Sequence, residues 1–238
     1  MGADEFLKGK KRFCLWLGDC EPDVLAGLPE CRKRVEAVRE YRAKSSRAAT
    51  KRLAGTPTRF QTENMPKSDY LLIPKVSSER REYIPIGFLS PETMCSDLVM
   101  LMPDASLFHF GVLTSSVHMA WMRTVAGRLK SDYRYSKDVV YNCFPWPDVT
   151  DRQRASIEEK ARGVLDARAA HPASTMANLY DPDTMPADLR KAHEALDRAV
   201  MAAYGCERNA KLGRERAFAE AEMVADLMRR YVAMTEGA

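Results

Sequence analysis

The segment Pro-Trp-Pro-Asp at residues 145–148 divides this sequence into two parts that follow different patterns. Before it, short runs of β-branched and aromatic residues alternate with Pro and Gly, which is typical of strands separated by turns. After it, apolar residues recur at helical spacing, and Pro or Gly marks the segment ends. The sequence therefore predicts an α+β fold: a mixed, β-rich domain with embedded helices over residues 1–148, and a small all-helical domain over residues 149–238.

Five runs in the first part favour strands. They are DYLLIPKV, REYIPIGFL, DLVMLMP, SLFHFGVL and DVVYNCF. Two helices are expected to interrupt this pattern, over residues 28–53 and 114–128. In the second part, amphipathic helices are expected over residues 150–172, 185–205 and 214–234, and the loop ASTMANLYDPDTMPA joins the first two.

Basic residues gather in the first part, although the whole chain carries a formal net charge of only +4. Residues 1–150 hold 23 Lys and Arg against 18 Asp and Glu, whereas residues 151–238 hold 14 against 15. Within residues 30–59 the count is ten against three. A local basic patch on a nearly neutral chain favours a directed contact with a polyanion. The alternative is a solvated helix face on which Glu36 and Glu40 oppose the arginines.

No catalytic centre is recognisable in the sequence. It lacks the phosphate-binding glycine loops, the zinc-protease helix, the nucleophile elbow, the N/D-P-P-Y/F loop of nucleobase methyltransferases and a nuclease core. The four histidines do not cluster. His109 and His118 fall in apolar runs and are predicted to be packed core residues, whereas His171 and His193 are predicted at the surface or at helix caps.

No metal site is expected either. The six cysteines form no C-x-x-C pair, and reduced, mostly buried thiols are the simplest reading. Asp181 and Asp183, in YDPDT, favour a turn over a metal-binding pair. No apolar run approaches the roughly 18–20 residues that cross a bilayer. The N-terminus has no secretory layout, so a cytoplasmic location without a membrane partner is expected.

Lys130 and Asp132 stand two residues apart in GRLKSDYRYSKDVVYNCFPWP, where tyrosines alternate with charges. On an extended strand such residues share a face and lie about 6.5–7 Å apart. Lys donates to guanine O6 and N7, and Asp accepts from N4 of the paired cytosine, so together they match one G·C pair in the major groove. Arg128 and Arg134 lie two residues before Lys130 and two residues after Asp132. On the same strand they would share that face, within reach of phosphates or neighbouring bases. The alternative is an ordinary surface salt bridge between Lys130 and Asp132.

Further residues are expected to contact DNA phosphates, because Lys and Arg neutralise these groups and Ser hydroxyls donate hydrogen bonds to them. They are Arg42, Lys44, Ser45, Arg47, Lys51, Arg52, Arg59, Arg128 and Lys137.

Four segments of the chain, spread from about residue 2 to about residue 235, resemble MmeI-like restriction–modification proteins. They are GADEFLKGKKRFCLWL, LAGTPTRFQTENMP, the stretch from YIPIGFLSPETMC to YNCFPWP, and LYDPDTMPADLRKAHEALDRAVMAAYG. Members of that family are large single chains. They combine an endonuclease, an adenine-N6 DNA methyltransferase that uses S-adenosylmethionine, and a target recognition domain followed by a helical tail. The resemblance implies that this chain corresponds to the last two parts.

The resemblance also implies roles for particular residues. The strand over residues 128–136 would carry the variable base-reading positions, with Lys130 and Asp132 selecting one base pair that has guanine on one strand. Arg134 matches a further base-contact position, working with a residue near Leu98. The intervening tyrosines would point to the opposite face and pack the domain.

These observations lead to one principal hypothesis and two alternatives. The chain is expected to recognise duplex DNA for a methyltransferase domain that it lacks, with S-adenosylmethionine bound in that missing domain and no catalytic or metal-binding residue in this chain. Full family members are several times longer, so the chain is expected to be a piece cut from a longer protein, the product of a truncated gene, or a separate subunit. A protein-interaction module stays open, as does a small enzyme with an unfamiliar site around Asp97, His109 and His118.

Overall fold

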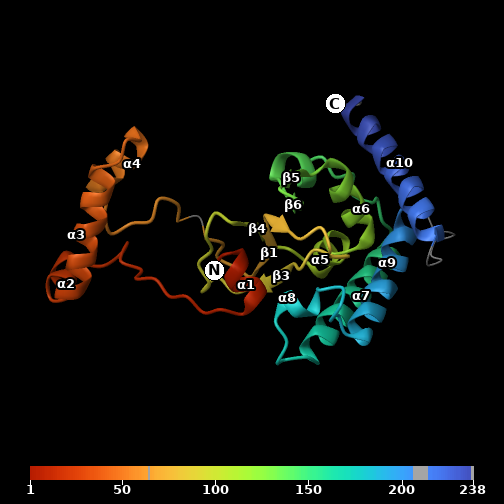
Figure 1. Ribbon diagram of the computed structural model, residues 1–238, viewed down its shortest axis with the longest axis horizontal. Coiled ribbons are helices and arrows are strands. Elements are labelled where there is room, and N and C mark those ends of the chain that lie inside the picture. The colour runs from red at the N-terminus through yellow and green to blue at the C-terminus, as the bar shows by residue number, and fades with distance from the viewer. Residues whose placement is uncertain (64, 206–213, 237–238) are drawn as a thin grey trace. The chain divides into compact units, whose positions relative to one another are not determined.

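The computed structural model of the chain describes residues 1–63, 65–205 and 214–236. By its internal contacts the chain divides into two compact units (Figure 1). The small unit comprises residues 12–65, and the main unit comprises residues 1–11 together with residues 66–238. The chain therefore enters the main unit, leaves it to form the small unit, and then returns.

Two antiparallel three-stranded sheets lie in the main unit. The first has the order β3–β1–β4, with β1 (Tyr70–Pro74), β3 (Gly87–Leu89) and β4 (Val99–Pro103). The second has the order β2–β6–β5, with β2 (Val76–Ser77), β5 (Gly127–Leu129) and β6 (Asp132–Arg134). Every residue of β1 is buried, so this central strand is covered on both faces.

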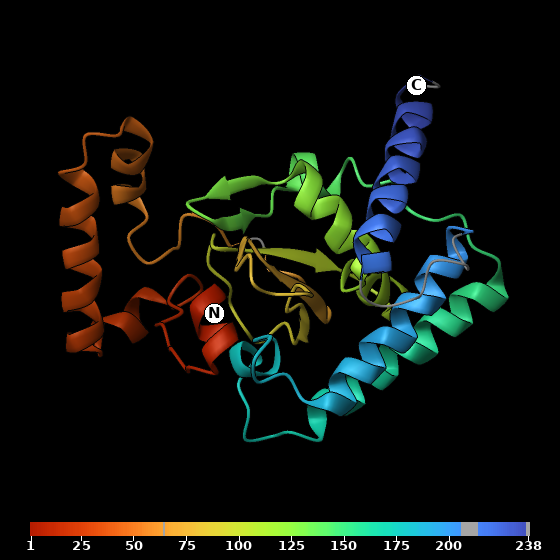
Figure 2. The ribbon, with the colours of Figure 1, turned by 45° about the vertical axis from the view of Figure 1, so that its right-hand side comes forward.

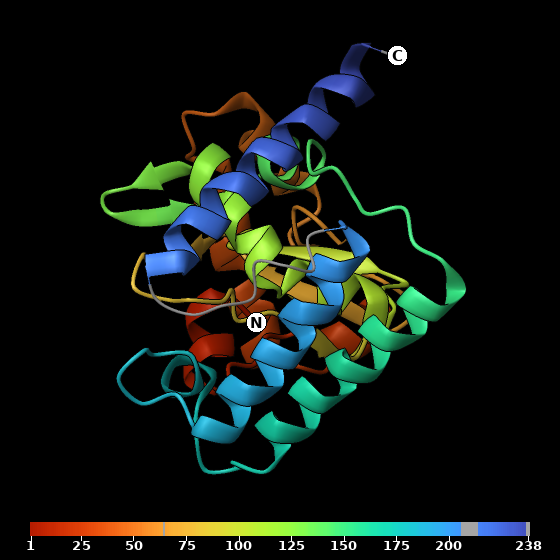
Figure 3. The same cartoon turned by 90° about the vertical axis from the view of Figure 1, so that its right-hand side faces the viewer.

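Helices surround the sheets and form the C-terminal part of the main unit. They are α1 (Ala3–Lys8), α5 (Leu107–Leu113), α6 (Ser116–Val125), the π-helical turn η2 (Lys137–Tyr141), α7 (Asp151–Ala169), α8 (Met176–Leu179), α9 (Ala187–Ala203) and α10 (Arg214–Glu236). α7 and α9 run side by side, and α10 packs against α6 (Figure 3). The predicted α+β class is confirmed, and the three long C-terminal helices occur where the sequence placed them.

Two predicted strands are wrong, because SLFHFGVL forms α5 and DVVYNCF begins with η2. Each helix starts at a serine cap: Ser106 donates its backbone N–H to His109 Nδ1 (3.0 Å), and the Ser136 hydroxyl accepts from Val139 N (3.1 Å). Five of the seven residues of α5 are buried, so its apolar residues surround the whole helix. A short apolar run of this kind does not separate a buried helix from a buried strand.

The small unit contains four short elements. They are α2 (Pro22–Ala26), α3 (Pro29–Ala43), α4 (Ala48–Arg52) and the 3₁₀ turn η1 (Leu53–Gly55). The single helix predicted over residues 28–53 is therefore wrong, because the helix is interrupted at residues 44–47. The Ser45 hydroxyl accepts a hydrogen bond from Arg47 N (3.2 Å), a local bond that competes with the helical pattern. The helix predicted over residues 114–128 is shorter than expected, since β5 begins at Gly127.

Buried polar contacts join the C-terminal helices to the sheet-containing part. Asp197 of α9 accepts from the Tyr83 hydroxyl (2.8 Å) and from the backbone N–H of Ser116 at the start of α6 (2.7 Å). Arg168 of α7 donates to the carbonyl of Ile86 (2.7 Å). Because these partners lie 81 to 114 positions apart in the sequence, the contacts fix the two parts of the main unit to each other.

Gly111 allows α5 to approach α7 and α9 closely. A Cβ atom at this position would lie 2.9 Å from Ile157 Cγ2, 3.2 Å from Ala161 Cβ and 3.3 Å from Leu196 Cδ1. Gly163, in the middle of α7, would place a Cβ with no atom within 4 Å. The two helical glycines therefore differ: one is required by packing, and the other is not.

We expect Gly111→Ala and Gly163→Ala to change stability in opposite directions. Gly163→Ala removes only the entropic cost of glycine in a helix and should raise the free energy of unfolding by about 0.5–1 kcal/mol. Gly111→Ala forces packed side chains apart and should lower it by about 1–3 kcal/mol. Urea unfolding followed by circular dichroism measures both. Equal stabilisation by the two variants would show that α5 does not pack as described.

Within the described ranges, no helix is both long enough and apolar enough to span a membrane.

Candidate nucleic-acid interface

The β5–β6 hairpin carries most of the residues predicted to read bases. Its register pairs Gly127 with Arg134, Arg128 with Tyr133 and Leu129 with Asp132, so residues 130–131 form a two-residue turn. Figure 2 shows the two strands as antiparallel arrows in the main unit. The stretch predicted as one extended strand is thus a hairpin folded back on itself.

Lys130 lies at the turn and has a φ of 57°, in the left-handed region. A two-residue hairpin turn requires positive φ because its twist must match that of the flanking strands. The expectation that Lys130 and Asp132 share one face of a strand is therefore wrong: Lys130 occupies the tip and Asp132 begins the returning strand. Lys130 is exposed, and no ion pair joins it to Asp132 in the described part of the chain, so the salt-bridge alternative is not what the structure contains.

Directly opposed residues of an antiparallel pair point to the same face, which gives the hairpin two distinct sides. On one side, the Arg128 guanidinium lies over the ring of buried Tyr133, 3.8 Å from its centroid. Arg128 also donates to the Ser131 carbonyl (2.8 Å) and lies 3.8 Å from a Glu79 carboxylate oxygen. Arg128 therefore does not share a face with Asp132 and Arg134, although the prediction of a single strand had placed all three on the same face.

The other side of the hairpin presents Gly127, Leu129, Asp132 and Arg134. Leu129 and Arg134 are exposed, whereas Asp132 is half-buried because the loop after β2 lies beside it. The backbone N–H of Glu79 donates to Asp132 Oδ1 at 3.4 Å. This face is open to a ligand and combines one carboxylate, one guanidinium and one aliphatic side chain.

Leu98 is joined to the hairpin through the backbone of Lys75. Lys75 N donates to the carbonyl of Leu98 (3.2 Å), and the carbonyl of Lys75 accepts from Tyr135 N (2.9 Å). Leu98 is 60% exposed, and Lys75 lies between it and Tyr135, the residue that follows β6. Sequence spacing gave no sign of Lys75 as the link, because its two partners lie far away in the chain.

Tyr133 and Tyr135 anchor the hairpin from behind, as predicted, since both are buried at 6% and 2% exposure. The Tyr135 hydroxyl is hydrogen-bonded to His118 Nε2 of α6 at 2.8 Å. The His118 ring also packs edge-on against Phe144, with centroids 4.4 Å apart. His118 is a buried core histidine, as predicted, and burial lowers its pKa to about 3.

The other histidines also have structural contacts. His109 caps α5, and His171 lies 2.9 Å from the Asp188 carboxylate. His193 was predicted at the surface, and this is wrong: it is fully buried, stacked on Tyr83 with centroids 4.0 Å apart. Burial lowers the pKa of His193 well below its usual value. Helical periodicity alone could have indicated it, because His193 lies four residues after Leu189 and three before Leu196 on the buried stripe of α9.

The two aspartates of YDPDT form a turn, as predicted. Asp183 N donates to Asp181 Oδ1 (3.0 Å), and the Asp183 carboxylate pairs with Arg80. The described residues contain no cluster of three or more metal-ligating side chains.

The prediction of mostly buried thiols is wrong for the five described cysteines, of which Cys14 is exposed and the others are half-buried.

The small unit holds the basic residues predicted to contact phosphates. Its sequence contains eleven Lys and Arg against seven Asp and Glu, whereas the remaining residues of the chain contain 26 of each kind. The net charge of +4 therefore resides in this unit. Its surface is the natural candidate for a polyanion contact.

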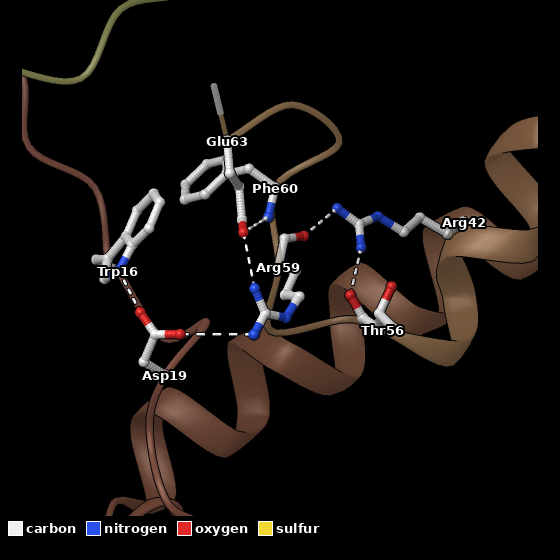
Figure 4. Close-up of polar contacts among 7 residues, drawn as sticks. All are labelled: Trp16, Asp19, Arg42, Thr56, Arg59, Phe60 and Glu63. Atoms are coloured by element: carbon white, nitrogen blue, oxygen red, sulfur yellow. Dashed lines mark hydrogen bonds and ion pairs between the residues drawn. The ribbon is translucent and has the colours of Figure 1, made fainter. Parts of the chain in front are cut away.

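Arg42 and Arg59 are occupied by contacts inside the small unit (Figure 4). Arg42 donates to the backbone carbonyls of Leu53 (3.1 Å), Thr56 (2.9 Å) and Arg59 (2.8 Å), which fastens the segment after η1 to the end of α3. The Arg59 guanidinium pairs with Glu63 (2.9 Å) and lies 3.5 Å from Asp19. Their structural roles were not visible in the sequence.

The other predicted phosphate contacts are more available. Arg47, Lys51, Arg52 and Lys137 are exposed, and no hydrogen bond or ion pair from their side chains occurs within the described ranges. Lys44 is 3.4 Å from Glu40 but its side chain is 79% exposed.

Comparison with known proteins assigns the family. Residues 1–148 match the family described as the MmeI target recognition domain, and residues 149–237 match the MmeI C-terminal domain. The chain belongs to the MmeI family, as a target recognition domain followed by a C-terminal domain.

Two relatives share almost the whole chain. DNA methyltransferase A of Bacillus subtilis (strain 168) is 38% identical over 237 residues, which is 99% of this chain and 26% of that protein. The structure of the type IIL restriction–modification enzyme MmeI in complex with DNA is 42% identical, with a TM-score of 0.92, over 99% of this chain and 30% of that one. The chain therefore spans between a quarter and a third of the length of these relatives.

We expect the buried histidines to make the fold sensitive to mild acid. Above pH about 6.5 they are neutral in both the folded and unfolded states, so they contribute no pH dependence. Below pH about 6.5 these histidines become protonated in the unfolded chain but stay neutral in the folded chain. The free energy of unfolding therefore falls with decreasing pH until the lowered pKa of the folded state is reached. For His118 the loss should reach about 2 kcal/mol at pH 5.

Urea unfolding at pH 7 and pH 5 tests this expectation. His118→Gln should be less stable at pH 7 but lose about 2 kcal/mol less than the wild type on acidification. Gly163→Ala, which leaves every histidine in place and meets no neighbouring atom within 4 Å, is the control and should retain the wild-type loss. An unchanged loss in His118→Gln would show that His118 is not held neutral.

Proposed function

We propose that this chain is the DNA-specificity part of a restriction–modification DNA methyltransferase, reading a base sequence in duplex DNA for a catalytic domain in another part of the protein. In this proposal residues 1–148 form the target recognition domain and residues 149–238 the C-terminal helical domain. The observation that carries the proposal is the β5–β6 hairpin: anchored by two buried tyrosines, it exposes Arg134 and the tip residue Lys130 and leaves Asp132 half-buried between them in sequence. A two-stranded ribbon fits the major groove.

The proposed reading chemistry follows from the side chains. Lys130 at the tip donates to guanine O6 and N7, while Asp132 accepts from the N4 amine of the paired cytosine. Arg134 donates to a further guanine, and Leu98 contributes to the reading of the same position. The turn places Lys130 ahead of Asp132 along the approach to the groove, so the two need not share a strand face to meet opposite edges of one base pair.

The small unit contributes the sequence-independent part of the proposed binding. Arg47, Lys51 and Arg52, with Lys44 and Ser45, supply phosphate contacts that position the duplex. Lys137 does the same at the start of η2. We assign Arg42 and Arg59 chiefly to positioning, since they hold the segments that bear the free basic side chains. Arg128 likewise stabilises the hairpin by covering Tyr133.

Methyl transfer would take place in the partner catalytic domain. The relatives named above include a DNA methyltransferase, and such enzymes generally use S-adenosylmethionine. We therefore propose that the partner domain binds this cofactor and modifies adenine N6, and that an endonuclease belongs to the same protein. Such a protein acts on DNA inside the cell, so the proposed location is the cytoplasm.

A protein-interaction or assembly role is the second candidate, and the small unit supplies the observation that favours it. Among its described residues Val35 is the one buried apolar side chain, whereas Phe13, Val24 and Tyr41 are 88%, 57% and 77% exposed. Exposed apolar side chains at this density are typical of surfaces that meet another protein. In that case the affinity for DNA would be weak and would show no base preference.

Salt dependence tests whether the small unit contacts phosphates. Removing two contacts in Lys51→Ala/Arg52→Ala should reduce the slope of log affinity against log salt by about 1.8, since each phosphate contact contributes about 0.9. Arg152→Ala/Arg162→Ala removes two exposed charges from α7 and should leave the slope nearly unchanged. Fluorescence anisotropy with a labelled duplex measures both. Equal slopes for all proteins would favour the assembly role.

Selection from a randomised duplex library tests base reading. The wild-type chain should enrich a motif, and Lys130→Glu/Asp132→Arg should change the preferred base at one position, because each good contact discriminates by about 1–3 kcal/mol. Tyr135→Phe, which keeps the buried ring but loses the hydrogen bond to His118, serves as a control and should retain the motif. Enrichment of the same motif by the charge-reversed variant would remove Lys130 and Asp132 from the reading surface.

A further inference from the structure

The register of the hairpin identifies an outward-facing residue that spacing along a single strand would not. Leu129 lies directly opposite Asp132, so the two side chains share the open face with Arg134. β5 contributes only this side chain to the face, because its other residue there is Gly127. Leu129 is 55% exposed, although the aromatic side chains of the same hairpin are buried.

Packing does not account for this leucine. The hairpin is held through its other face, where Tyr133 is buried beneath Arg128, and Leu129 sits on the side away from that contact. Its neighbours are charged: Asp132 opposite, Arg134 two residue pairs along the ladder, and Lys130 next in sequence. An exposed aliphatic side chain among charged residues is not stabilised by contact with water. It also has no polar group with which to form a hydrogen bond to a base.

We infer that Leu129 is a specificity-determining residue that contacts the C5-methyl group of a thymine in the major groove. This inference rests on the proposed function. The thymine methyl is the one apolar group that distinguishes base pairs at the major-groove edge, and it is read by apolar side chains. A basic surround formed by Lys130 and Arg134 suits duplex DNA rather than a second apolar protein surface.

Geometry limits which base pair Leu129 reads. Side chains directly opposite in an antiparallel pair have Cβ atoms about 5 Å apart, while successive base pairs are stacked about 3.4 Å apart. The thymine therefore lies in the base pair next to the one read by Asp132. The contact adds an A·T preference beside the G·C preference that Lys130 and Asp132 supply.

Replacement of thymine by uracil tests this contact without altering any hydrogen-bonding group. With the selected motif in a fixed duplex, each thymine is replaced in turn by deoxyuridine. Wild-type affinity should fall about fourfold at one thymine, the effect of one buried methyl group. That thymine should adjoin the position changed by Lys130→Glu/Asp132→Arg. Leu129→Ala should bind the thymine and uracil duplexes equally, whereas Leu129→Met should retain the difference.

The controls separate the possible failures. Val232→Ala removes an aliphatic side chain of similar exposure, 46%, from α10 and should behave as the wild type. A motif without a methyl-sensitive thymine, or a Leu129→Ala protein that still prefers thymine, overturns the inference and leaves the proposed function standing. Absence of any motif in the wild type overturns both.

Discussion

Burial of Tyr133 and Tyr135 determines which side chains of the β5–β6 hairpin face outward. Side chains alternate along a strand, so two tyrosines fixed in the core force Asp132 and Arg134 outward. The hydrogen bond between Tyr135 and His118 ties this arrangement to α6, and α6 in turn packs against α10. A one-residue slip would bury the charges and expose the aromatic rings. The outward orientation of Asp132 and Arg134 is therefore fixed by the packing of the tyrosines in the core rather than by the hairpin itself.

The two units are stabilised by different means. The main unit has a continuous apolar core from β1 through α5 to α9, with buried polar contacts such as Asp197 to Tyr83 inside it. The small unit depends on polar contacts, above all the three backbone carbonyls that Arg42 holds. This division suits the proposed function, because base reading requires rigid geometry, whereas attraction to phosphates requires mainly charge.

Several elements could be predicted from local sequence. The long C-terminal helices follow from apolar periodicity and end signals, and Thr150 caps α7 by accepting a hydrogen bond from Gln153 N at 3.3 Å. The α5 segment could not be predicted, because an apolar run that is buried on every side carries no period. The η2 segment was mistaken for a strand because its neighbouring valines and tyrosine are β-formers, although Val140 is its one buried residue. Arg42 and Arg59 belong to the residue type that binds phosphates, yet four of the five partners named above lie 11 to 40 positions away, and Glu63 alone of these is near, four residues after Arg59. Contacts between residues that are far apart in the sequence cannot be predicted from local sequence patterns.

The sequence by itself determined the fold class, the concentration of positive charge and the family resemblance, because composition, period and motif are local properties. Only the tertiary structure decided that Lys130 lies at a turn, that Leu129 faces outward opposite Asp132, and that Leu98 reaches the hairpin through Lys75. Strand pairing brings distant residues onto one face, and its register follows from which side chains the core accepts.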